Sequence, residues 1–133
     1  SRCQREGRGF DPLCPLHIIM NDLLKKKCKP CEGGVIPFDI SEIHKFQKKI
    51  DGWDVIKNKK NIFYLHKQFK FKNFKESQNF INNVGNISEE EGHHPDIHFG
   101  WGYAEIDITS HAIEGLSEND FILAAKIDKI LNV

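Results

Sequence analysis

The chain has 133 residues, a length typical of one domain that buries a core without help from disulfides or metals. Nineteen basic and nineteen acidic side chains cancel, which argues against a general nucleic-acid binder. A hydrophobic content of 39% with ten Phe is globular composition, and no apolar run reaches the length of a membrane span. A membrane protein, a collagen and a wholly disordered chain are therefore excluded.

The N-terminal part of the chain is expected to lie outside the compact domain. Residues 1–19 contain two Pro and two Gly and show no helical or strand period, so we expect a non-native or disordered extension. Met20 is then the expected native start. Residues 20–37 read as a polar arm with a break at Gly33-Gly34, and residues 38–133 as the folded domain.

The four cysteines do not form a clear metal or disulfide pattern. Cys28 and Cys31 make a C-x-x-C, but Cys3 and Cys14 lie eleven residues apart, which suits a four-cysteine zinc site poorly. Reduced thiols in a cytoplasmic protein are the favoured interpretation. A zinc or redox role for Cys28 and Cys31 is the alternative.

Three segments show helical signals and four show strand signals. Asp39 with Glu42, and Asn73 with Glu76, have capping-box spacing, each before apolar residues at helical intervals. The first helix is expected to stop at Asp51-Gly52 and the second near Glu91-Gly92. A third helix is expected over 121–131, with Ser117 and Asp120 as its cap.

Strands are expected around 53–55, over 63–71, and over 97–101 and 103–109. In the second of these, Phe63, Leu65, Phe69 and Phe71 share one parity, which Lys67 interrupts. Short hairpin connections favour antiparallel pairing. The sequence therefore predicts an α+β fold of two layers, a four-stranded antiparallel sheet with three helices packed on one face.

Charge is distributed unevenly along this fold. No Lys or Arg occurs between Lys75 and Lys126, whereas ten acidic residues and four of the seven histidines do. Carboxylates favour the protonated imidazole, which suits proton transfer near neutral pH. A phosphorylated substrate would find no cation in this stretch, so proton transfer on a neutral substrate fits it better than phosphoryl chemistry.

The strongest local signal is the segment Glu89-Glu90-Glu91-Gly92-His93-His94-Pro95. It places two adjacent histidines at a helix C-terminus, where the dipole favours imidazolium, and Pro95 forces an extended exit. Glu89 lies four residues before His93, so the two would meet if the helix persists. His111 is expected to end the last strand on the face of Asp107 and Thr109.

Each of these residues also has a purely structural interpretation. The histidine pair is equally typical of a solvated helix end, Asp120 of a helix cap, and Trp101 of a half-buried strand aromatic. His93, His94 and His111 also form a ligand-like set, but zinc requires the imidazoles to converge, which spacing does not establish.

Taken together, Glu89-x-x-x-His93-His94-Pro95, Trp101, Thr109-Ser110-His111 and Gly115-Leu116-Ser117-x-x-Asp120 closely resemble the pterin-4a-carbinolamine dehydratase family. The resemblance covers roughly residues 36–130. It implies a four-stranded antiparallel sheet with three helices on one side, a homodimer or homotetramer, and no metal or organic cofactor. The implied reaction dehydrates 4a-hydroxytetrahydrobiopterin to quinonoid dihydrobiopterin, which recycles the pterin of aromatic amino acid hydroxylases.

By the same resemblance, His93 and His111 would do acid and base work near the leaving hydroxyl. His94 would hold the pterin, and Glu89 would set the charge of an imidazole. Weaker candidates for pterin contacts are Thr109, Ser110, Asp120 and Trp101. Gly92 and Asn119 depart from residues frequent in the family, without affecting the three histidines.

Two other classes of function stay open. Some animal members of the family also serve as dimerisation cofactors of a homeodomain transcription factor, so a catalytically silent protein-binding module is the main alternative. The other class is a metal-binding protein that uses His93, His94 and His111 or the cysteine pair. Direct contact with nucleic acid or membrane is not expected.

Overall fold

The computed structural model describes residues 23–28 and 36–131. The expected extension 1–19, Met20 and Cys31 lie outside the described residues. The elements in chain order are α2 (Ile40–Gln47), β1 (Asp54–Lys57), β2 (Phe63–Lys70), α3 (Phe74–Glu91), β3 (Asp96–Gly100), β4 (Tyr103–Ile108), the 3-10 helix η2 (His111–Ile113) and α4 (Glu118–Leu131).

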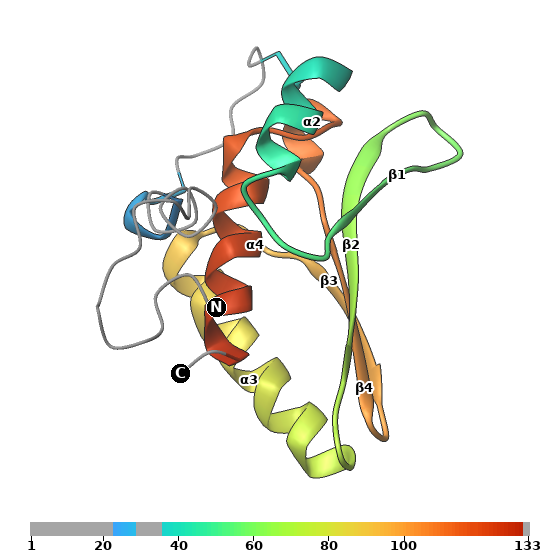
Figure 1. Ribbon diagram of the computed structural model, residues 1–133, viewed down its shortest axis with the longest axis vertical. Coiled ribbons are helices and arrows are strands. Elements are labelled where there is room, and N and C mark those ends of the chain that lie inside the picture. The colour runs from blue at the N-terminus through green and yellow to red at the C-terminus, as the bar shows by residue number, and fades with distance from the viewer. Residues whose placement is uncertain (1–22, 29–35, 132–133) are drawn as a thin grey trace, which may run out of the picture.

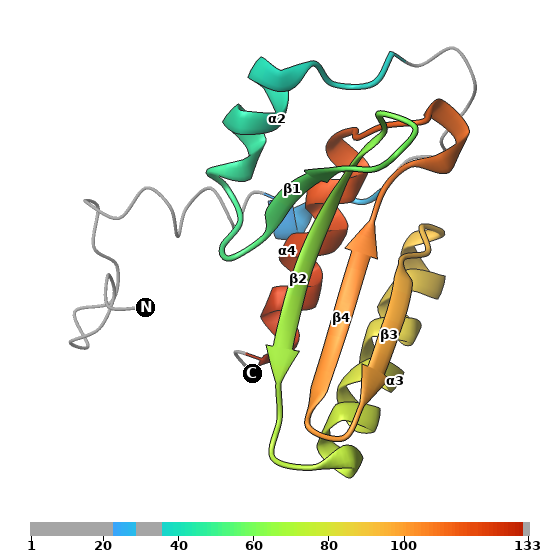
Figure 2. The same ribbon diagram turned by 90° about the vertical axis from the view of Figure 1, so that its right-hand side faces the viewer.

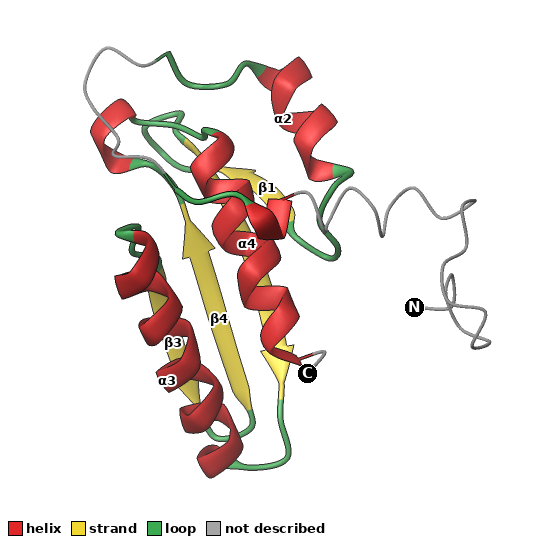
Figure 3. Ribbon diagram, turned by 90° about the vertical axis from the view of Figure 1, so that its left-hand side faces the viewer, coloured by secondary structure: helices red, strands yellow, loops and turns green. Residues whose placement is uncertain are grey.

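The four strands form one antiparallel sheet in the order β1-β2-β4-β3. Figure 2 shows the bare face of this sheet, and Figure 3 shows α3 and α4 lying across the opposite face. In Figure 1 all the helices lie on the same side. The predicted α+β architecture is confirmed.

The first two predicted helix starts carry the expected caps. The Asp39 Oδ1 atom accepts the Glu42 backbone N–H at 2.9 Å, and the Asn73 Oδ1 atom accepts that of Glu76 at the same distance. These bonds satisfy donors that the first helical turn leaves over. Helix α2 ends at Gln47, before the expected stop at Asp51-Gly52. The N–H groups of Lys49 and Ile50 bond carbonyls three residues back, which is a tighter turn.

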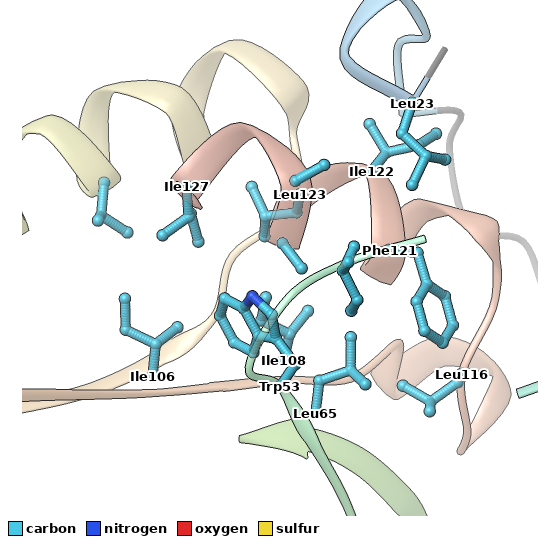
Figure 4. Packing of buried hydrophobic residues seen from close by; sticks show 14 of the residues in the cluster. Leu23, Trp53, Leu65, Ile106, Ile108, Leu116, Phe121, Ile122, Leu123 and Ile127 are labelled. Atoms are coloured by element: carbon cyan, nitrogen blue, oxygen red, sulfur yellow. The ribbon is translucent and has the colours of Figure 1, made fainter. Parts of the chain in front are cut away.

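The core lies between the sheet and the two long helices. Figure 4 shows apolar side chains of β2, β4 and α4 meeting in this layer. Leu23, which precedes the expected domain, is also fully buried, but beside Ile122 on the side of α4 that faces away from the sheet (Figure 4). The largest fully buried apolar side chains include Leu23, Ile43, Leu65, Val84, Ile106, Ile108, Leu116, Phe121, Ile122, Leu123 and Ile127.

Lys67 interrupts the apolar row of β2 because it serves a buried carboxylate. Its ammonium lies 2.8 Å from Asp128 Oδ1 and 2.8 Å from the Asp51 carbonyl oxygen. The other Asp128 oxygen accepts the Trp53 indole N–H at 3.0 Å. Burial raises the pKa of Asp128, and the Lys67 cation opposes that rise. The helix-facing side of the sheet thus contains one buried ion pair.

Within the described ranges 23–28 and 36–131, no helix combines the length and the apolar character needed to cross a membrane.

Replacing Lys67 by Met should destabilise the fold by about 3 kcal/mol at pH 7, because Asp128 stays buried without its cation and keeps the Trp53 hydrogen bond. Removing the cation raises the Asp128 pKa further, so the native state binds a proton more readily than the unfolded chain. The deficit should therefore shrink as pH falls. Urea unfolding at pH 7 and pH 5 tests this, with Lys70→Met on the exposed side of β2 as control. A pH-independent loss, or none, would contradict it.

Candidate active site

The candidate site lies at one end of the sheet, the upper end in Figure 2. There α3 ends, β4 runs into a short loop with η2, and α4 begins. Three separate stretches of the sequence signature therefore meet at one place.

His93 is held in a buried position at the end of α3. Gly92 adopts a left-handed conformation, with φ of 65°, and this ends the helix. The His93 backbone N–H then donates to the Ser88 carbonyl at 3.2 Å. The imidazole turns inward, where its Nε2 atom lies 2.7 Å from Asp120 Oδ1. The His93 residue is only 8% exposed.

Asp120 has no exposed surface and receives three partners. His93 contacts its Oδ1 atom, and its Oδ2 atom accepts the Ser110 hydroxyl and the Ser117 backbone N–H, each at 2.8 Å. The Ser117 bond is a helix cap, because it satisfies an N–H just before α4. Asp120 therefore both caps the helix and contacts a histidine, so the two interpretations of this residue are compatible.

His94 and Glu89 form a second, exposed pair. The His94 Nε2 atom lies 2.6 Å from Glu89 Oε2, and both side chains are well exposed. The expected contact between Glu89 and His93 is wrong, because Glu89 pairs with His94 instead. Because α3 ends at Glu91 and Gly92 turns the chain, the four-residue helical spacing does not continue to His93.

His111 does not end a strand as expected. β4 stops at Ile108, and the backbone bridge between Ser110 and Gly115 closes a loop in which His111 opens η2. The His111 residue is exposed. It follows directly on Ser110, which is bonded to Asp120, and so belongs to the same end of the molecule. Thr109 is a structural partner here, since its hydroxyl donates to the Phe63 carbonyl at 2.9 Å.

Trp101 is not brought to this cluster. It occupies the turn of the β3–β4 hairpin, beside Gly102 with φ of 77°, and is 70% exposed. Five residues of β3 separate that turn from the His93 end, which is roughly 16 Å at strand spacing. Figure 2 shows the hairpin at the lower end of the sheet, away from the start of α4.

The sequence reading missed Glu91 and its partners. The Glu91 carboxylate is 4% exposed and accepts the Lys126 ammonium at 2.5 Å and the Cys28 backbone N–H at 2.8 Å. Burial acts to raise the pKa of Glu91, but the Cys28 and Lys126 hydrogen bonds outweigh it, and the net pKa is lowered. One signal in the sequence could have indicated this ion pair. Glu91 lies in the stretch without Lys or Arg, and Lys126 is the first cation that follows that stretch.

Cys28 is placed for packing rather than reactivity. Its thiol donates to the Asn119 carbonyl at 3.5 Å, and burial, followed by the Glu91 charge, raises its pKa to about 12. A nucleophilic or metal-binding cysteine needs the opposite shift. In the part of the chain that the structure describes, no three His, Cys, Asp or Glu side chains converge as metal ligands.

A shallow hollow of about 210 Å³ lies beside the start of α4. It is lined by Lys26, Lys27, Glu118, Asn119 and Ile122. None of the predicted site residues lines it, but Asn119 is adjacent to Asp120. Residues of the arm and the start of α4 thus line this hollow together.

The protein is thus an α+β sheet with helices on one face, and at one end of it two adjacent histidines are each paired with a carboxylate. The family model for pterin 4 alpha carbinolamine dehydratase matches residues 37–130, and the chain belongs to this family. A relative from Rubrobacter xylanophilus is 44% identical over 111 residues, covering 84% of this chain and all of the relative. One from Alkaliphilus metalliredigens is 45% identical over 111 residues, covering 83% and 96%. Both names assign the dehydratase activity provisionally.

Solved structures agree in fold. A transcriptional coactivator/pterin dehydratase from Brucella melitensis has a TM-score of 0.64 at 23% identity, covering 71% of this chain and 97% of that one. A pterin dehydratase-like protein, described as a RuBisCO assembly factor in the alpha-carboxysome, has a TM-score of 0.51 at 26% identity, covering 59% and 88%. The fold is therefore shared by proteins with different described roles.

In the folded protein, the Cys28 thiol should resist alkylation at pH 8. With a pKa of about 12, only about one thiol in 10⁴ is ionised, against roughly a quarter for an ordinary cysteine. The test uses a variant in which Cys3, Cys14 and Cys31 are Ser, and compares iodoacetamide labelling with and without urea. Labelling of the folded variant at the rate of a free thiol would contradict the buried placement.

Proposed function

We propose that this protein is a 4a-hydroxytetrahydrobiopterin dehydratase that produces quinonoid dihydrobiopterin and water. The observation that carries the proposal is the contact of buried His93 with Asp120 at the same end of the fold as His94, Glu89 and His111. The family membership supports it independently. The product would be recycled for aromatic amino acid hydroxylases, in a cytoplasmic homodimer or homotetramer.

The chemistry needs two proton transfers and no electron transfer. The C4a–O bond breaks as the hydroxyl gains a proton and leaves as water, while N5 loses its proton and forms a double bond to C4a. An imidazole positioned at each site typically contributes about 10²–10⁴-fold to the rate. We assign these transfers to His93 and His111. His94, paired with Glu89 at the surface, would hold and orient the pterin.

A second candidate function is a protein-binding module without catalysis. It is favoured by one specific observation, that a structural neighbour at 26% identity is described as an assembly factor. Pull-down with the full chain, followed by a dehydration assay on the same preparation, distinguishes the two. A stoichiometric partner with no dehydration would favour the module.

The His93→Ala variant should lose about 10²–10⁴-fold in kcat for dehydration of 4a-hydroxytetrahydropterin, because one proton transfer loses its carrier. Stopped-flow absorbance measures it. His98→Ala removes an exposed histidine of β3 from the same acidic stretch and should match wild type. The proposal fails if folded wild type does not exceed a His93→Ala, His111→Ala double variant.

The His94→Ala variant should act mainly on binding. His94 is exposed and paired with exposed Glu89, so its loss should raise KM about tenfold, equivalent to about 1.4 kcal/mol, with kcat changed much less. Full saturation curves for wild type and variant test the split. A fall in kcat as large as that of His93→Ala, with KM unchanged, would instead make His94 a proton carrier.

A further inference from the structure

We infer that Asp120 and Ser110 are positioning residues that hold His93 with its proton on Nε2, so that Nδ1 is the nitrogen that exchanges protons with the substrate. The inference rests on the proposed function and deepens it, since it assigns the working atom of His93. It concerns two residues that would act through His93 and not on the pterin.

The first step is the hydrogen bonding of the Asp120 carboxyl group. A backbone N–H can only donate, so the Ser117 bond requires Asp120 Oδ2 to accept. The Ser110 hydroxyl donates to the same oxygen at 2.8 Å. With two donors fixed on Oδ2 in a fully buried position, the group acts as a carboxylate, and Oδ1 is the acceptor that faces His93.

The second step is the state of the imidazole. Because Oδ1 accepts, His93 Nε2 carries the hydrogen in the 2.7 Å contact. Only Nδ1 is then left for a ligand. Neutral His93 accepts the N5 proton at Nδ1 while His111 gives a proton to the leaving hydroxyl, which departs as water. The His93 imidazolium stays bonded to Asp120 and then returns its proton from Nδ1 to solvent, from which His111 is reprotonated. The Asp120 contact is retained through the cycle.

Ser110 is held in place by its own backbone. Its backbone N–H and carbonyl both bond Gly115, and the residue is 1% exposed. The one further partner of its hydroxyl is the Ser117 hydroxyl at 3.2 Å. Removing the Ser110 hydroxyl leaves Oδ2 with the Ser117 N–H alone, and the carboxylate can then turn away from His93.

The experiment measures the His93 tautomer directly, by ¹⁵N NMR of the full chain with labelled histidine, assigned with His93→Gln. Wild type should show hydrogen on Nε2 and a bare Nδ1 when the ring is neutral. In Asp120→Asn, the amide oxygen keeps the Ser117 bond and the amide NH₂ faces Nε2 as a donor. The hydrogen should therefore move to Nδ1, and kcat should fall about 10²–10⁴-fold.

Ser110→Ala should broaden or mix the His93 tautomers and lower kcat by about tenfold, with KM within twofold of wild type. The matched control is Ser77→Ala, which removes another fully buried serine hydroxyl, bonded to the Asn73 carbonyl in α3. It should change neither reading. Circular dichroism confirms that each variant is folded.

Wild-type His93 with its hydrogen on Nδ1 would overturn the inference, as would Asp120→Asn with an unchanged tautomer. The tautomer reading needs no turnover. A wild type that fails to dehydrate the pterin yet keeps the Nε2 hydrogen would therefore reject the proposed function and leave only the assignment of the His93 tautomer and its positioning residues standing.

Discussion

The buried carboxylate of Asp120 is the constraint on which this end of the molecule depends. A buried carboxylate without donors costs several kcal/mol, and its donors here come from the end of α3, the loop after β4 and the start of α4. All three segments must be in place before the charge is satisfied. The site is therefore complete only when this end of the fold is closed. Its residues come from three segments, which explains why the signature residues are dispersed along the sequence.

The two adjacent histidines have opposite surroundings because of one backbone feature. Gly92 in the left-handed conformation sends His93 inward to Asp120, and the next residue, His94, faces solvent beside Glu89. A buried ring with a fixed partner keeps its orientation, whereas an exposed ring can adjust to a ligand. The same dipeptide thus supplies one rigid group and one adaptable group.

The features that the sequence predicted well depend on residues only a few positions apart. They are the helix caps at Asp39 and Asn73 and the alternation of side chains in β2, and the structure contains each of them. The partner of Glu89 was missed because one left-handed residue ends the helical spacing. The distance of Trp101 from His93 follows from the extended strand β3 between them, which the sequence interpretation did not apply to this residue. The contact of Cys28 with Glu91 joins residues 63 positions apart and follows only from the assembled fold.

The contact between Cys28 and Glu91 has a consequence for how the domain is delimited. The family match begins at residue 37, yet Leu23 is buried in the core and Cys28 supplies a hydrogen bond to a carboxylate two residues from His93. The segment that the family model matches is therefore smaller than the packed domain, whereas the relatives align over 111 residues and so extend beyond that segment. A protein trimmed to residues 37–130 would expose apolar surface on α4 and weaken the support of the histidines, so mutational comparisons among relatives need matched N-termini.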